Sequence, residues 1–253
     1  MSSPIPQRGQ RGTVQSIERA LEIVDSLAAS GGSATLQTMA TDTGLPLATL
    51  HRICGTLADS GYLRRGPGRE YLLGPRLHRA GLVAAGATAG WATSILTRIV
   101  EETGETANLV VRERDGVVYL AQVPSPHSMR MFTEVGRRVE IHCTAVGKVL
   151  AADLPDEEIR AVLARSGMRR ETEHTITNEA AYLAEIDTVR RVGYATDESE
   201  QEEGVRCVAV REGSGPSAVA FSVSGPEARF TPERRDAAVE VMLEALRTMP
   251  GRR

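Results

Sequence analysis

The segment ATLHR (48–52) gathers the residue types in this chain that are best suited to reading nucleic acid. The apolar residues around it repeat at the i, i+3, i+4, i+7 spacing of a helix: Leu50, Ile53, Cys54 and Leu57. The opposite side of that helix carries Ala48, His51 and Arg52, with Thr49 at its flank. The first turns of a recognition helix are the part that reaches base edges in the major groove, so this layout indicates DNA readout.

A short helix is predicted just before that segment. Leu36, Met39 and Ala40 have the spacing of its buried face, and Gly44 can supply the turn between the two helices. The two helices outline a helix-turn-helix, although an ordinary αα-hairpin within a larger core has the same spacing. Apolar residues at intervals of three and four predict a further helix over residues 14–27.

A basic hairpin is predicted directly after the second helix. Residues 62–65 and 69–73 have strand character, and the Gly-Pro-Gly sequence at 66–68 predicts a turn between them. A hairpin in this place is typical of a winged helix, which favours the DNA-binding interpretation over the αα-hairpin. Three arginines would lie on the wing, where guanidinium groups pair with backbone phosphates: Arg64, Arg65 and Arg69.

Two more features of the first half can contact the DNA backbone. Ser33 or Thr35 is placed to cap the short helix, and a threonine there can also donate to a phosphate. Residues 1–12 are rich in Pro, Gly, Gln and Arg without periodicity, which predicts a disordered arm. Its Arg11 can enter a minor groove as other basic arms do, although a merely solvated tail fits the composition as well.

Charge is distributed unevenly along the chain. The 253 residues carry a formal net charge of −3, which is unusual for a DNA-binding protein. Residues 1–88 hold nine arginines against six acidic residues, a net +3, whereas the remainder holds 21 basic against 27 acidic residues, a net −6. This asymmetry indicates a DNA-reading head joined to an acidic partner domain.

Composition narrows the class of protein. With 41% hydrophobic and 25% charged residues, the chain has the balance of one or two soluble globular domains. No apolar run approaches the roughly 20 residues that cross a bilayer, and the start lacks the apolar core of a signal peptide, so we expect a cytoplasmic protein without membrane contact. Cys54, Cys143 and Cys207 are far apart and odd in number, which predicts no disulfide framework.

The second half mixes strands and helices. A linker helix is expected over residues 76–90, and residues 91–103 continue as a helix with Trp91, Ile95 and Ile99 buried. An Asp-Gly turn joins two strand-like runs, 107–112 and 117–122, into a predicted hairpin. Further strands are expected at 129–132, 205–211 and 218–224, and further helices at 144–152, 155–166, 179–192 and 232–249. Because strands and helices do not alternate regularly, we expect an α+β fold with a mainly antiparallel sheet.

Several motifs, in this order, resemble those of the IclR family of bacterial transcription regulators. They are VQSIERALEIVDSL (14–27), GLPLATLHRICGTLADSGYL (44–63), YLLGPRL (71–77), HCTAVGKVLAADLPDEE (142–158), HTIT (174–177), RRVGYATDESEQEEGVRCVAV (190–210) and FSVSGPEARFT (221–231). With the elements above, the resemblance implies an arm at 1–12, a winged helix-turn-helix domain at 13–75, a linker helix at 76–90 and a GAF-like effector-binding domain at 91–253. It also implies dimers that often pair into tetramers.

The resemblance implies DNA contacts by Thr49, His51 and Arg52. Leu47 and Ala48 stand where the family more often has polar residues, so they are expected to contact thymine methyl groups instead. Arg52 has a second interpretation, as a structural salt bridge within the head.

The resemblance also implies an effector pocket. The polar positions of the family's pocket correspond here to Asp197, Cys207, Ser222 and Ser224, and its apolar wall corresponds to Met131, Val139 and Val205. Ala145 and Val146 correspond to the start of a helix, whose free backbone amides can hold a carboxylate. Alternate residues of a strand point the same way, so Ser222 and Ser224 can both donate to one anion. Each polar member can instead be a satisfied structural group, and Cys207 a small buried apolar one.

The spacing of the His, Cys and Asp residues fits catalysis or metal binding less well than it fits a regulator. Cys143 beside His142, or Cys207 with Asp197, could be a nucleophile and its partner, yet adjacent residues usually point apart and no second base is placed by spacing. Zinc binding by the same His and Cys residues is an alternative, but the spacing resembles no closed zinc site. We therefore expect no enzyme, no cofactor and no metal site.

The expected function is a repressor that binds a near-palindromic double-stranded DNA operator as a dimer and leaves it when a small organic acid binds. Residues 104–109, 128–131 and 136–139 are similar to family members that repress allantoin and glyoxylate use, which favours a ureide or glyoxylate-type acid. Aromatic acids, sugar acids and other carbon sources remain alternatives, with the low aromatic content arguing against a large ring. The same architecture can also activate transcription.

Overall fold

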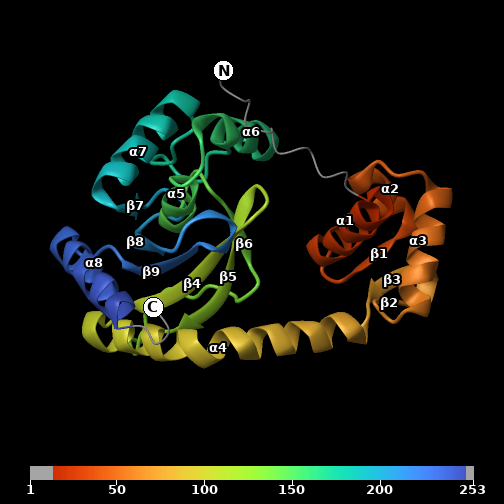
Figure 1. Cartoon of the computed structure of the whole chain (residues 1–253), viewed down its shortest axis with the longest axis horizontal. Coiled ribbons are helices and arrows are strands. Elements are labelled where there is room, and N and C mark those ends of the chain that lie inside the picture. Colours follow the sequence, from red (N-terminus) through yellow and green to blue (C-terminus); the bar gives the residue numbers. More distant parts are fainter. Residues whose placement is uncertain (1–13, 249–253) are drawn as a thin grey trace, which may run out of the picture. The chain divides into compact units, whose positions relative to one another are not determined.

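The computed structural model describes residues 14–248, apart from the side chains of residues 88 and 89. The arm at 1–12, with Arg11, lies outside the described residues. The chain divides into two compact units, Met1–Ala84 and Ala85–Arg253. The division falls inside α4 (Pro75–Thr103), because the predicted linker helix and the helix after it are one element (Figure 1). No single helix among the described residues is long and apolar enough to cross a membrane; the two halves of α4 qualify only together, by length and composition.

The first unit is a winged helix-turn-helix, as predicted. Three helices and three antiparallel strands, in the sheet order β1-β3-β2, make it up: α1 (Gln15–Ala29), α2 (Leu36–Thr43), α3 (Leu47–Asp59), β1 (Ser33–Thr35), β2 (Leu63–Arg65) and β3 (Glu70–Leu73). A short 3-10 turn, Pro67–Arg69, joins β2 to β3 and forms the tip of the wing. Sequence patterns did not predict β1, which is only three residues long.

Local signals explain where the helices begin and end. Thr35 caps α2 by accepting a hydrogen bond from the Thr38 amide at 3.2 Å, and Gly44 ends α2 in the left-handed region with φ of 68°. The core of the unit consists of these residues: Ile23, Leu27, Ala34, Met39, Leu50, Cys54, Leu63 and Tyr71. The apolar residues at intervals of three and four correctly predicted α1. The first three of them, Val14, Ile17 and Leu21, are nevertheless at least half exposed.

The second unit is an α+β domain built on one six-stranded antiparallel sheet, in the order β6-β5-β4-β9-β8-β7. Its strands are β4 (Thr106–Glu113), β5 (Gly116–Val123), β6 (Arg138–Glu140), β7 (Tyr194–Glu198), β8 (Val205–Glu212) and β9 (Val219–Pro226). Its further helices are α5 (Ala145–Ala151), α6 (Asp156–Ser166), α7 (Glu179–Val192) and α8 (Pro232–Arg247). The C-terminal half of α4 and α8 cover one face of the sheet, and α5, α6 and α7 lie on the other (Figure 1).

Strand alternation sorts the side chains between these two faces. On β9, Phe221 and Val223 pack with α4 and α8, whereas Ser222 and Ser224, which alternate with them, face the side of α5. Two sequence predictions for this unit are wrong. Residues 129–132 form no strand. Instead of backbone pairing with a neighbouring strand, two side-chain hydrogen bonds hold this connection: the Thr106 hydroxyl donates to the Met131 carbonyl, and the Ser125 hydroxyl donates to the Gly104 carbonyl. Trp91, predicted to be buried, is 38% exposed.

Candidate DNA-binding face and effector cavity

The outer face of α3 presents the residues predicted to read DNA. Leu50 and Cys54 are fully buried in the core, so the helix has one fixed orientation on the unit. Leu47, Ala48, His51 and Arg52 are exposed, and Thr49 is half-buried: these five lie in the first two turns of the helix. The structure therefore leaves the start of α3 open to a partner.

The wing places its arginines close to the same helix. Arg64, Arg65 and Arg69 are exposed. His51 of α3 and Arg65 and Arg69 of the wing line one groove, so the recognition helix and the wing share a surface. The hydroxyl oxygen of Thr35 accepts the Thr38 amide, which holds this residue at the start of α2.

Arg52 lies at the edge of a second groove, between α1 and α3. Gln15 and Arg19 of α1 line it together with Arg52. Within residues 14–248, no carboxylate pairs with the Arg52 guanidinium, so the structure does not show the internal salt bridge that the sequence left as an alternative. Its charge is available at the surface.

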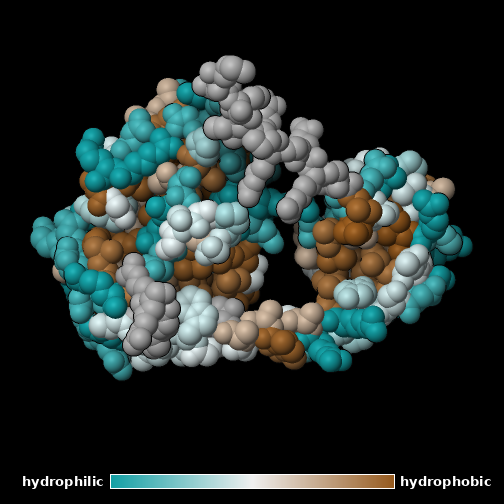
Figure 2. Space-filling view, viewed as in Figure 1, coloured by the Kyte–Doolittle hydropathy of each residue, from teal (hydrophilic) through white to brown (hydrophobic). Residues whose placement is uncertain are grey.

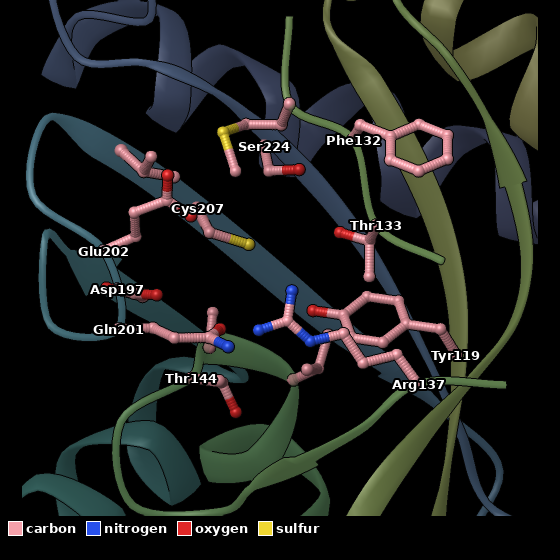
Figure 3. Close-up of a pocket in the computed structure, with 14 residues that line it drawn as sticks. Tyr119, Phe132, Thr133, Arg137, Thr144, Asp197, Gln201, Glu202, Cys207 and Ser224 are labelled. Carbon is pink, nitrogen blue, oxygen red and sulfur yellow. The ribbon is translucent and has the colours of Figure 1, made fainter. Parts of the chain in front are cut away.

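The second unit holds a polar cavity on the α5 side of the sheet (Figure 3). It has a volume of about 490 Å³, part of which is open to solvent. Strands β5, β7, β8 and β9, the start of α5 and the β5–β6 and β7–β8 connections provide its walls: Tyr119, Met131, Phe132, Thr133, Arg137, Thr144, Ala145, Val146, Asp197, Gln201, Glu202, Val205, Cys207 and Ser224. Asp197, Cys207 and Ser224 form a row because they are paired across β7, β8 and β9.

The structure brings together seven of the nine predicted pocket residues: Met131, Ala145, Val146, Asp197, Val205, Cys207 and Ser224. Val139 lines a neighbouring cavity instead. Ser222 is fully buried behind the wall, where its hydroxyl accepts a hydrogen bond from the Asn108 amide at 3.2 Å. The two serines do point the same way and both accept from the Asn108 side-chain amide, but only Ser224 lines the cavity.

Asp197 places a buried carboxyl group in the cavity wall. It is 4% exposed, and one carboxylate oxygen accepts the Glu200 amide at 2.7 Å. Burial raises the pKa of Asp197 from 3.8 to about 7, although the nearby Lys148 ammonium partly opposes this change. That ammonium is itself engaged, since it donates to the Thr196 carbonyl at 3.0 Å and to the Glu200 carboxylate at 2.5 Å. The cavity carboxyl therefore takes up a proton at a higher pH than an exposed aspartate does.

The buried cysteines are unsuited to nucleophilic catalysis. Burial raises the pKa of Cys143 to about 12 and raises that of Cys207 further, so both side chains are thiols at neutral pH. Among the described residues, no three His, Cys, Asp or Glu side chains lie where they could hold a metal ion.

Sequence reasoning missed other polar residues of the cavity, chiefly Tyr119 and Arg137. A signal existed for Tyr119, because strand alternation puts it on the same face as the buried Val117. Arg137 precedes β6 in a connection without periodicity, and the resemblance of residues 136–139 to allantoin and glyoxylate regulators did not assign it to the pocket. The remaining missed lining residues are Phe132, Thr133, Thr144, Gln201 and Glu202.

A winged helix-turn-helix with exposed arginines, continued by one helix into a domain with a polar cavity, defines a DNA-binding transcription regulator with a ligand-sensing domain. The chain belongs to the IclR family. Residues 16–67 match the IclR helix-turn-helix domain, and residues 88–249 match the bacterial transcriptional regulator IclR C-terminal domain. These are families of regulators and not of enzymes.

Known proteins resemble the chain over nearly its whole length. HTH-type transcriptional regulator BhcR of Paracoccus denitrificans is 32% identical over 243 residues, covering 94% of this chain and 87% of that protein. Transcriptional repressor IclR of Escherichia coli is 31% identical over 252 residues, covering 92% of both. A crystal structure of a putative IclR transcriptional regulator from Silicibacter sp. matches with a TM-score of 0.82 and 26% identity, covering 91% of this chain and 92% of that one.

Proposed function

We propose that this regulator is a repressor that binds a near-palindromic operator and is released by a small organic acid. The observation that carries the proposal is the set of exposed arginines on α3 and the wing, Arg52, Arg64, Arg65 and Arg69, with the exposed His51 between them. Guanidinium groups on the wing supply phosphate contacts, and the start of α3 supplies base contacts. Thr49, Leu47 and Ala48 complete the reading face, and Thr35 and Arg11 add backbone contacts.

Exposed apolar side chains support a homodimer that pairs further into a tetramer. Val14, Ile17 and Leu21 on α1 are 58%, 57% and 50% exposed, and Leu82 and Val83 on α4 are 61% and 68% exposed. Figure 2 shows apolar side chains gathered on one face of the first unit. Contiguous exposed apolar side chains mark surfaces that are covered in the assembled protein. A dimer sets two recognition helices about one DNA turn apart, roughly 34 Å.

A ureide or glyoxylate-type acid is the proposed effector. The segments that resemble allantoin and glyoxylate regulators include Met131 and Arg137, which line the cavity. The cavity walls carry both donors and acceptors, which suits a small, polar acid. Aromatic acids are the second candidate, because the rings of Tyr119 and Phe132 also border the cavity despite the low aromatic content of the chain.

Release follows from a difference in affinity between two dimer geometries. An acid that binds one geometry more tightly by about 3 kcal/mol lowers operator affinity by roughly two decades, provided that this geometry no longer matches the half-site spacing. An acid with equal affinity for both geometries would bind without releasing DNA.

Fluorescence anisotropy on labelled DNA from immediately upstream of the gene tests the proposal. We expect specific binding by the wild type, a large loss with Arg52→Ala, and release by one member of a panel containing glyoxylate, allantoate and 4-hydroxybenzoate. Release by 4-hydroxybenzoate alone would replace the ureide assignment with an aromatic acid. Binding to the DNA without release by any acid would contradict control by an acid. Absence of specific binding would contradict the proposal that this DNA contains the operator.

A further inference from the structure

The effector cavity has two chemically different walls. Tyr119 and Arg137 reach in from β5 and the β5–β6 connection, and both end in hydrogen-bond donors. Asp197 and Glu202 lie on the opposite wall, at the end of β7 and in the turn before β8, and carry carboxyl groups (Figure 3). A ligand that satisfies both walls must present an acceptor to one and donors to the other.

Arg137 is the cationic residue among those that line the cavity. Its guanidinium has no hydrogen-bond or ion-pair partner among residues 14–248. Figure 3 shows the group pointing into the cavity between Tyr119 and Gln201. Lys148 cannot replace it, because Lys148 is 1% exposed, does not line the cavity and is paired with Glu200.

Tyr119 supplies a second donor beside that guanidinium. Its side chain is 7% exposed and borders the cavity, and no partner of its hydroxyl is found within the described part of the chain. Burial raises the pKa of Tyr119, and the positive charge of Arg137 opposes this only partly. The hydroxyl therefore keeps its proton and can donate it in a hydrogen bond at any physiological pH.

We propose that Arg137 and Tyr119 together bind the carboxylate of the effector, and that the donor groups at the other end of the acid face Asp197. The inference rests on the proposed function and names the chemical class of its ligand. That class is a small acid with hydroxyl, hydrated carbonyl or ureido groups opposite its carboxylate. A guanidinium and a phenol hydroxyl offer a carboxylate several directed donors at once.

Calorimetric titration of the full-length protein with glyoxylate, allantoate and 4-hydroxybenzoate, and with the matching primary amides, tests the inference. For the acid that binds best, we expect Arg137→Gln to weaken affinity roughly 50-fold, Arg137→Lys to weaken it less, and Tyr119→Phe to weaken it roughly fivefold. Arg138→Gln is the matched control, because Arg138 is also exposed but lines the neighbouring cavity. It should stay within twofold of the wild type.

Comparing each acid with its neutral amide separates recognition of the negative charge from recognition of the molecule's shape. The wild type should prefer acid over amide, and Arg137→Gln should lose that preference while still binding the operator. An Arg137→Gln protein whose acid affinity stays within twofold, or which keeps the preference for acid, would overturn this inference and leave acid-controlled release standing. A wild-type protein that binds no acid of the panel would overturn this inference together with acid control.

Discussion

The carboxyl group of Asp197 makes the stability of the second unit depend on pH. Its pKa is raised from 3.8 to about 7, with burial and the neighbouring Glu200 carboxylate raising it and Lys148 lowering it. Between these two values the folded protein binds more protons than the unfolded one, so the free energy of unfolding falls as pH rises. The loss is complete above about pH 7, where the buried carboxylate is charged.

Asp197→Asn removes this dependence while keeping an acceptor for the Glu200 amide. We expect the stability of the variant relative to wild type to grow by about 3 kcal/mol between pH 5 and pH 8. Urea unfolding followed by circular dichroism at both pH values measures the difference. A difference that stays constant across this range would show that the carboxyl has an ordinary pKa.

Lys148 and Glu200 form a buried ion pair whose partners depend on each other. The side chains are 1% and 9% exposed, and the second carboxylate oxygen of Glu200 has no partner among the described residues. We expect Lys148→Met to destabilise the second unit by about 3–5 kcal/mol, because it leaves a buried charge uncompensated. Thermal and urea unfolding measure this loss.

The double variant Lys148→Met/Glu200→Gln is the control for that prediction. It removes both charges of the close pair and leaves Glu185, whose carboxylate lies 3.6 Å from the Lys148 ammonium but is 31% exposed to solvent. Most of the lost stability should therefore return. If the double variant is as unstable as Lys148→Met alone, packing of the lysine stem and not its charge explains the effect.

At the scale of elements, Gly147 sets how closely α5 approaches the chain that follows β6. A Cβ atom at this position would overlap the Ile141 backbone and the Thr144 hydroxyl, which are too near for any side chain. Gly147→Ala should therefore cost about 3 kcal/mol and move the start of α5, which borders the cavity. Differential scanning fluorimetry with and without the effector measures both consequences.

Gly81→Ala in α4 is a matched control, because open space surrounds that position. There the added methyl should raise stability by up to about 1 kcal/mol, as expected in a helix. Equal effects of the two substitutions would contradict the close approach of α5.

The elements that the sequence predicts well are those with a strong local signal. Periodic apolar residues predicted α2 and α3, with a cap at Thr35 for α2, and the Asp-Gly turn predicted the β4–β5 hairpin. Residues 129–132 of the β5–β6 connection were predicted as a strand, yet two prolines precede them and the Met129 and Met131 carbonyls accept hydrogen bonds from the distant Arg229 and Thr106 side chains. Long-range contacts of this kind leave no periodic trace in a sequence.

The same distinction applies to the cavity. Family motifs predicted the cavity residues that lie on strands and at the start of α5. Arg137 lies in an irregular connection, and only the folded structure shows that it reaches the cavity. Ser222 satisfied the alternation rule but is fully buried against its neighbours, among them Asn108 of β4, and does not line the cavity. Alternation gives the face of a sheet, and neighbours decide what remains exposed on it.

At the scale of the whole molecule, the distribution of charge matters more than its total. Although the net charge is −3, residues 1–88 carry +3, and the exposed arginines of α3 and the wing lie there. Operator affinity should therefore fall steeply with salt. Arg64→Ala with Arg65→Ala should lower the slope of log affinity against log salt by roughly two per protomer, since each phosphate contact releases about one counterion.

Arg160→Ala on α6 is the control for this measurement, because Arg160 is an exposed arginine of the second unit that pairs with Glu179. Its slope should equal that of the wild type. Equal slopes for the wing variant and the wild type would mean that the wing does not contact phosphates.

The burial of Lys148 also determines which covalent chemistry can act on this protein. It is the chain's single lysine, and it is enclosed and ion-paired. Acetylation, ubiquitin attachment and amine-reactive dyes all require an accessible amine, so in the folded protein they find no lysine side chain to acylate and are left with the α-amino group. The positive charge offered to DNA is carried by arginine alone, and lysine acylation cannot neutralise it.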